Sequence, residues 1–341
     1  MRTQCTRPIE AWYSSTINDT GKRSLVFDPK HSNEPDNKFH IPCQRCIGCR
    51  FEKSRQWAMR CVHEAKMHED NCFLTLTFTD EELLKRENPW SVDKRDFQLF
   101  MKKLRKLTPK KIGYFHCGEY GEKNLRPHYH ACIFNYDFDD KQFLKKSGSH
   151  NLYVSEKLNG TKFLNDNFPH LNNRINTKSG KRPLKGLWPY GSVIIGELTF
   201  NSAAYTARYV MKKINGQRLE QVDEKTGLKP YERYDGNTGE IIKVNPEYAT
   251  MSRNPAIGKR FLEKYKGDIY PKDYVTVNGK KMKPAKYYDR WMQENHSFEI
   301  EEIKDRRQDV DREYITVRRE QQKDEFNEIC AKRFQRDQKT K

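Results

Sequence analysis

The chain has 341 residues, enough to bury a sizeable core, and this length favours one large domain or two modest ones. Its 65 lysine and arginine residues against 47 aspartate and glutamate residues give a net charge of +18, which favours nucleic acid as a partner. No apolar run reaches the roughly 18 residues of a spanning helix, so we expect no membrane partner. Nine cysteines without an export signal predict reduced thiols or metal ligands rather than disulfides.

A cysteine cluster follows the polar, turn-rich residues 1–42. Its C-x2-C-x2-C spacing brings two thiolates to one metal, and the third cysteine extends the arc. Zinc requires a fourth ligand, for which Cys5 is the first choice and Cys61 or His63 the alternatives. Three reduced thiols without a metal are the competing interpretation. An iron–sulfur site would need a further cysteine a few residues on, where the sequence has a lysine. The cluster consists of Cys43, Cys46 and Cys49.

The next elements are a helix, a strand and a second helix. Apolar residues at helical spacing predict a helix over residues 50–68, and the run FLTLTF predicts a buried strand at 73–78. Asp93 is a suitable N-cap for the second helix, which Pro109 ends. The apolar stripe of this helix belongs to a core.

Residues 112–135 carry the densest chemistry. They predict an antiparallel hairpin with a turn-rich connection. His128 and His130 are two apart on a strand and therefore point to the same face. Glu119, at the exit of the first strand, can supply an oxygen. The set is then two histidines and one carboxylate, with coordination positions left open for substrate and water.

An isolated His-x-His pair is a weak signal, because most such pairs are ordinary surface or core residues. A histidine-triad hydrolase would need a third alternating histidine, and that position holds Cys132. The metzincin pattern HExxH is absent as well. The assignment of the histidine pair therefore depends on features further along the chain.

The rest of the chain alternates regular elements with polar insertions, and its last part contains neither glycine nor proline. We expect a short helix at 139–146, an insertion at 147–188, a strand at 192–198, a helix at 203–214 capped by Asn201, a hairpin within 217–250, and one long charged helix from about Tyr287.

Tyr205 and Tyr209 are four residues apart on the helix at 203–214, and Lys212 is three further on, so all three project from one face. A tyrosine hydroxyl can attack phosphorus and form a covalent phosphodiester that conserves the energy of the broken strand. A free phenol titrates near ~10. A metal on the phosphate and a nearby lysine must therefore stabilise the charge. Amphipathic packing is the ordinary explanation of such a pair. The histidine pair, the carboxylate and the basic charge together favour an active site.

Three segments resemble the motifs of the rolling-circle replication initiators of the HUH superfamily: FLTLTF at 73–78, PHYH at 127–130 and YTARYVMKK at 205–213. The two-tyrosine form is similar to that of microviruses, small phages with single-stranded DNA. PCQRCIGCR, SRQWAMRC, CGEYGEKNLRPHYH and NPAIGKRFLEKYKGDIYP resemble the replication initiation protein of the gokushovirus branch. Such matches cover most of residues 40–290.

The resemblance implies that His128 and His130 bind Mg²⁺ or Mn²⁺, with Glu119 or Glu122 as third ligand, and that the two tyrosines alternate as nucleophiles. Together with the order of elements it implies an α+β fold. The expected sheet is mostly antiparallel and of the HUH-endonuclease (RRM/ferredoxin-like) type, with flanking helices and a cysteine-rich N-terminal segment. The expected division is an N-terminal segment at 1–68, an endonuclease domain at 69–290 with insertions near 147–188 and 217–250, and a charged tail at 291–341.

The expected activity is metal-dependent nicking and strand transfer at the origin of a circular phage genome, through a 5′-phosphotyrosine. The expected partners are origin DNA and host replication proteins such as a helicase and a polymerase, in the cytoplasm of a bacterial host. Two alternatives stay open. One is a plasmid initiator or single-strand transposase of the same superfamily, and the other is a non-enzymatic zinc-containing nucleic-acid-binding protein.

Overall fold

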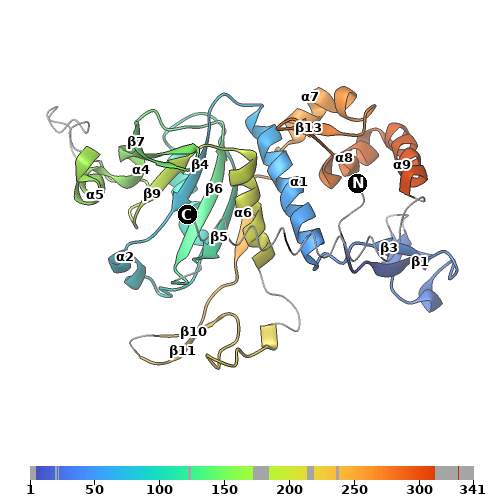
Figure 1. Cartoon of the computed structure of the whole chain (residues 1–341), viewed down its shortest axis with the longest axis horizontal. Coiled ribbons are helices and arrows are strands. Elements are labelled where there is room, and N and C mark those ends of the chain that lie inside the picture. Colours follow the sequence, from blue (N-terminus) through green and yellow to red (C-terminus); the bar gives the residue numbers. More distant parts are fainter. Residues whose placement is uncertain are drawn as a thin grey trace. The chain divides into compact units, whose positions relative to one another are not determined.

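The computed structural model describes residues 5–19, 21, 23–121, 124–171, 184–212, 219–235, 238–311 and 329. The chain divides into two compact units, each described separately below (Figure 1). Among the residues that the structure describes, no helix combines the length and the apolar character that crossing a bilayer requires. The larger unit is Arg55–Tyr288, and the smaller unit combines Met1–Ser54 with Asp289–Lys341.

A seven-stranded sheet forms the centre of the larger unit, in the order β12-β5-β6-β4-β9-β8-β7. Every neighbouring pair is antiparallel. The mixed α+β class, the antiparallel sheet and the cysteine-rich N-terminal segment are therefore confirmed. The strands are β4 (Asn71–Leu76), β5 (Gly113–Tyr120), β6 (Pro127–Phe134), β7 (Lys141–Ser147), β8 (His150–Ser155), β9 (Val193–Gly196) and β12 (Tyr248–Met251).

Helices flank this sheet, and two small hairpins complete the unit. Figure 1 shows α6 lying across β5 and β6, and it contacts both of these strands. The helices are α1 (Ile47–Ala65, which begins in the smaller unit), α2 (Asp80–Leu84), α3 (Lys94–Leu104), α4 (Glu156–Asn159), α5 (Thr161–Asn167), the 3-10 helix η2 (Pro169–Leu171), α6 (Phe200–Lys212) and α7 (Lys259–Ile269). The hairpins are β10 (Glu232–Tyr234) with β11 (Ile241–Lys243), and β13 (Val275–Val277) with β14 (Lys280–Met282).

The two faces of the sheet bury different cores, because successive side chains of a strand point to opposite faces. On one face, Phe115 and Cys132 pack with Ala203 of α6. On the other face, Tyr129 packs with Phe97 of α3. The Tyr129 hydroxyl donates to Asp96 at 2.6 Å and accepts from the backbone N–H of Asp93 at 2.9 Å. These bonds fix β6 from the α3 face and leave its histidines on the α6 face.

The smaller unit contains a three-stranded antiparallel sheet in the order β2-β1-β3. The sequence indicated only a polar, turn-rich segment here, so this sheet was not predicted. Asp289 and Arg307 form an ion pair at 2.9 Å within the unit. The elements are β1 (Ile9–Ile17), β2 (Arg23–Val26), the 3-10 helix η1 (Pro29–His31), β3 (Phe39–Ile41), α8 (Lys286–Asn295, which begins in the larger unit) and α9 (Ser297–Asp311).

Three local predictions were wrong. The expected helix at 139–146 is the strand β7, because Gly148 adopts a left-handed φ of 60° in a tight turn that folds β8 back along β7. The expected single helix from Tyr287 is two helices, with α8 ending at Asn295. Asn201 does not cap α6. Thr199 lies before the helix and accepts a hydrogen bond from the backbone N–H of Ser202 at 3.2 Å.

Candidate active site

Pairing between β5 and β6 brings Glu119 directly opposite His128. His130 lies two residues further along β6 and shares the same face. Nε2 of His128 is 2.7 Å from Glu119 Oε1, and Nε2 of His130 is 2.9 Å from the same oxygen. Glu119 is 1% exposed and His130 4% exposed, so these two groups are almost fully withdrawn from water, whereas the His128 side chain is 18% exposed. The structure therefore brings together the three side chains that the sequence of the hairpin predicted to meet.

The second nitrogen of each histidine is held by a neighbour. His128 Nδ1 lies 3.2 Å from the carbonyl oxygen of Arg126, which can only accept, so Nδ1 carries the proton. His130 Nδ1 lies 3.0 Å from Oγ1 of Thr75, the residue opposite His130 on β4. Such partners fix the ring orientation and the tautomer of a metal-ligating histidine. Thr75 lies in a strand that the sequence predicted, but its role was missed.

The positions of the protons in this cluster show whether the three side chains fit a metal. With its proton on Nδ1, a neutral His128 points the lone pair of Nε2 at a carboxylate oxygen only 2.7 Å away. Two negative lone pairs at that distance repel each other unless a cation lies between them. A proton or a divalent metal satisfies this requirement. Two imidazole nitrogens and one carboxylate oxygen form a donor set suited to a divalent transition metal.

The electrostatics of the cluster keep Glu119 ionised. Burial by itself raises the pKa of the carboxyl, but when His128 and His130 carry a proton on Nε2, their hydrogen bonds and positive charges outweigh burial and hold its pKa below the usual range. Strand β5, which carries Glu119, is also closely packed on its opposite face. A Cβ added at Gly118 would lie 2.7 Å from the ring of Tyr248 on β12, so this position needs glycine.

Helix α6 carries the predicted tyrosines. The ring of Tyr205 packs edge-to-face on His130, with 4.9 Å between centroids. The guanidinium of Arg208 lies 5.7 Å from the Tyr205 ring. The structure therefore brings Tyr205 next to the cluster. Tyr209 and Lys212 belong to α6, but their side chains lie outside the described residues, as does Glu122, the alternative third ligand.

The cysteine cluster lies in the smaller unit, and Cys5 joins the three cysteines of the repeat. The four sulfur atoms lie within 4.8 Å of one another. Backbone N–H groups point at them: Cys46 N is 3.3 Å from Cys43 Sγ, and Cys49 N is 3.4 Å from Cys46 Sγ. Four converging thiols with amide donors fit a tetrahedral zinc site.

The thiols of this cluster differ in pKa. Burial raises the pKa of Cys46, but backbone N–H groups of Cys49 and Thr6 and the thiols of Cys49 and Cys43 lower it to about 6. Burial raises the pKa of Cys49. The alternative fourth ligands occur in other settings. Cys61 is fully buried in the core beside α6, and His63 Nδ1 lies 2.8 Å from the Tyr288 hydroxyl.

The fold and the two clusters together define a strongly basic α+β protein with two candidate metal sites. Residues 71–214, from β4 to just beyond α6, match the family described as Replication-associated protein ORF2. Replication-associated protein VP4 of Bdellovibrio phage phiMH2K is 31% identical over 303 residues, which are 86% of this chain and 78% of the phage protein. Replication-associated protein ORF2 of Spiroplasma virus 4 is 31% identical over 292 residues, 79% of this chain and 73% of that protein.

Replication-associated protein ORF4 of Chlamydia phage 1 is 31% identical over 179 residues, 51% of this chain and 39% of that protein. No solved structure matches the chain. The chain belongs to the ORF2 family of replication-associated proteins and is homologous to the replication proteins of these microviruses. The family resemblance drawn from the sequence motifs is thereby confirmed.

Proposed function

We propose that the chain initiates rolling-circle replication as a metal-dependent, sequence-specific single-strand DNA endonuclease and strand transferase. The observation that carries this proposal is the convergence of two histidine Nε2 atoms on one oxygen of Glu119, with the Tyr205 ring packed against His130. A buried metal-ligand set beside a phenol, in a protein of a replication family, suits transesterification at phosphorus.

In this proposal, His128, His130 and Glu119 hold Mg²⁺ or Mn²⁺. When bound, the metal polarises the scissile phosphate. Thr75 and the Arg126 carbonyl keep the two imidazoles aimed at the metal position. The burial of Glu119 and His130 limits access of water, which strengthens the electrostatic interactions at the phosphate.

The phenol oxygen of a tyrosine forms the new bond to phosphorus, and the 3′ oxygen of the preceding nucleotide leaves and takes up a proton. One phosphodiester replaces another, so later rejoining needs no ATP. Tyr205 and Tyr209 alternate as nucleophiles in successive rounds, and Lys212 stabilises phenolate or leaving-group charge. The position of Tyr205 beside His130 supports its part in this scheme.

The wider proposal concerns the fold type, the division of the chain and its partners. We assign the sheet to the HUH-endonuclease (RRM/ferredoxin-like) type and the catalytic domain to residues 69–290, between an N-terminal segment at 1–68 and a tail at 291–341. The cysteine cluster holds structural Zn²⁺. The partners are origin DNA and the helicase and polymerase of a bacterial host, in whose cytoplasm the protein acts. The net charge of +18 supports binding to DNA.

The decisive experiment is nicking of a supercoiled duplex phage circle, with Mg²⁺ or Mn²⁺ supplied or withheld. We expect Tyr205→Phe and Tyr209→Phe each to form a covalent adduct with a single-stranded origin oligonucleotide, and the double variant to form none. Release of closed single-stranded circles should fail in both single variants, because one phenol cannot hold an adduct and cut again.

The alternatives predict other outcomes. A non-enzymatic zinc protein binds the circle but leaves it intact with every metal. If Tyr205→Phe alone removes every adduct and Tyr209→Phe behaves as wild type through many rounds, a single nucleophile acts and the alternation is wrong. A plasmid initiator or transposase cleaves its own target but not this circle.

A further inference from the structure

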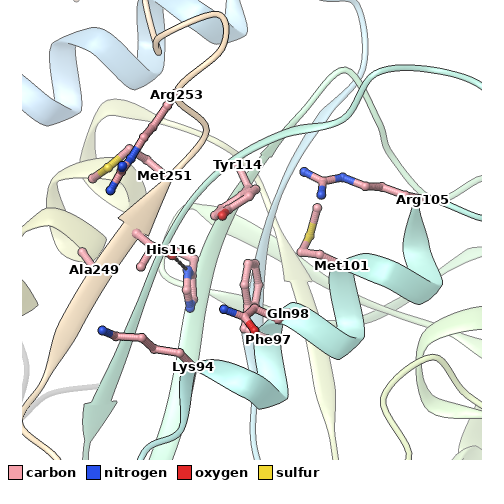
Figure 2. Close-up of a pocket in the computed structure, with 11 residues that line it drawn as sticks. Lys94, Phe97, Gln98, Met101, Arg105, Tyr114, His116, Ala249, Met251 and Arg253 are labelled. Carbon is pink, nitrogen blue, oxygen red and sulfur yellow. Dashed lines mark hydrogen bonds between the residues drawn. The ribbon is translucent and has the colours of Figure 1, made fainter.

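A cavity of about 450 Å³ opens between α3, the edge strand β12 and its neighbour β5 in the larger unit. Figure 2 shows α3 on one side of it, β12 and the segment after it on the other, and two side chains of β5 between them. A volume of this size accommodates a small ligand. Its lining includes Lys94, Phe97, Gln98, Arg105, Tyr114 and Arg253.

This cavity lies on the opposite face of the sheet from the candidate active site. Tyr114 and His116 alternate along β5 with the residues that share the face of Glu119, so they point to the α3 face. The cavity therefore does not contain the metal ligands. A ligand there would not compete with the scissile phosphate.

The charged residues of the cavity are all cations. Lys94, Arg105 and Arg253 line it, and none of its lining residues is a carboxylate. All three are exposed, so they form a rim from which flexible side chains can reach a ligand. Figure 2 shows Lys94 at the start of α3 and Arg105 just after its end, across from Arg253. Three cations without a counter-charge suit a phosphate group.

The interior of the cavity is aromatic and apolar. Phe97 and Met101 are buried, and Tyr114 is half-buried, with 5.4 Å between the Phe97 and Tyr114 centroids. His116 stacks on Phe97 at 3.6 Å, and its Nδ1 lies 2.7 Å from Thr250 Oγ1. Burial lowers the pKa of His116 to about 3, so this ring is neutral near pH 7. An aromatic interior without charge suits a planar base.

We propose that this cavity binds a deoxynucleoside phosphate, with the base against Tyr114 and the phosphate held by Arg105 and Arg253. The exposed amide of Gln98 can hydrogen-bond to an edge of the base. The same chemistry is offered by one nucleotide of a single DNA strand and by a free nucleotide. The site binds its ligand without cleavage, so it does not rest on the nuclease reaction. It provides the protein with a second nucleotide contact, on the α3 face of the sheet.

Calorimetric titration of the full-length protein with thymidine 5′-monophosphate, thymidine, inorganic phosphate and a short oligothymidylate tests this site. We expect Arg105→Glu/Arg253→Glu to weaken binding of the monophosphate or the oligonucleotide by at least about tenfold. The matched control is Arg95→Glu/Lys102→Glu. It reverses two exposed charges of α3 that do not line the cavity and should retain binding.

The probes also distinguish the two sources of the ligand. Oligothymidylate that displaces the monophosphate assigns the site to single-stranded DNA. The same assignment follows if oligothymidylate binds but the monophosphate does not bind at all. Monophosphate binding that the oligonucleotide cannot displace assigns it to a free nucleotide. Equal weakening by the two charge-reversed pairs overturns the proposal, because a general basic field would then explain binding. It is also overturned if inorganic phosphate binds as tightly as the monophosphate, or if no probe binds.

A 5-bromodeoxyuridine oligonucleotide gives a second, independent readout. Its photo-crosslink should map to Tyr114 by mass spectrometry and should be reduced in the Arg105→Glu/Arg253→Glu variant but not in the control pair. For a nucleotide bound within a strand, crosslinks confined to the α6 face of the sheet would contradict the assignment.

Discussion

The two groups of candidate metal ligands are built in different ways. Glu119, His128 and His130 lie on paired strands of a seven-stranded sheet, and strand register alone brings them together. The four cysteines lie in irregular segments and at the first turn of α1, where backbone N–H groups rather than strand pairing surround the sulfur atoms. The first group depends on the core of a large unit, whereas the second can help to create the fold of a small one.

The two ligand sets also differ in the number of coordination positions that they leave open. Four thiols complete the tetrahedral coordination of zinc and leave no position for a substrate. Two imidazoles and a carboxylate provide three ligands and leave positions open. The comparison therefore favours the proposed structural role of the cysteine cluster and the proposed catalytic role of the Glu119 cluster. Variants of each cluster should have opposite consequences.

The largest effect is expected from His130→Ala. Loss of this imidazole removes one of three ligands, so cleavage of a single-stranded origin oligonucleotide should fall by at least about a thousandfold. Binding of the same oligonucleotide and the zinc content should be unchanged. The control is His150→Ala, which removes a more exposed histidine from β8 of the same sheet, where it pairs with Glu197 at 3.5 Å. Wild-type turnover of His130→Ala in chelator-treated buffer would refute the metal assignment.

Cys43→Ala/Cys46→Ala should have the converse effect. Elemental analysis of the wild type should give about one zinc per chain, and the double variant should have none. Because the binding energy of a structural zinc is folding energy, limited proteolysis should then cut the smaller unit while the larger unit persists. Cys72→Ala, which changes a buried cysteine of the sheet core, should retain the zinc. Unchanged zinc in the double variant would separate the cysteines from any metal.

The sequence predicted those parts of both sites that depend on local spacing. His128, His130 and Glu119 belong to one hairpin, and three cysteines share one short repeat, so strand alternation and turn geometry were sufficient. The edge strand β12 was missed because its partner is distant in sequence: Thr250 lies opposite His116, 134 residues away. Burial patterns of single segments contain no information about such pairing.

Thr75 is the clearest example of what local patterns cannot reveal. Its strand was predicted, but only the register between β4 and β6 brings Thr75 opposite His130. A threonine in a strand is ordinary until that pairing is known. The fourth thiol, Cys5, was named from the coordination number of zinc, and its approach to Cys43 depends on the fold of the smaller unit.

Thr75→Val provides the smallest and most discriminating test of the sheet-borne cluster. Valine has the shape of threonine but no hydroxyl, so His130 Nδ1 loses its partner at 3.0 Å while the packing of β4 is retained. Partners of this kind are worth about 10- to 100-fold in metal affinity or activity. We therefore expect the Mg²⁺ or Mn²⁺ concentration for half-maximal cleavage to rise by about tenfold or more, and Thr75→Ser to restore it.

Thr77→Val is the matched control for this experiment. Thr77 lies just beyond the end of β4, two residues after Thr75, and its hydroxyl donates to the Ser192 carbonyl at 3.1 Å rather than contacting a histidine. Both valine variants lose one hydrogen bond and should lose a similar free energy of unfolding, about 1 kcal/mol. Only Thr75→Val should change the metal dependence of cleavage. If the two variants shift that dependence equally, the hydroxyl of Thr75 stabilises the sheet but does not orient His130, and the metal site depends on strand register alone.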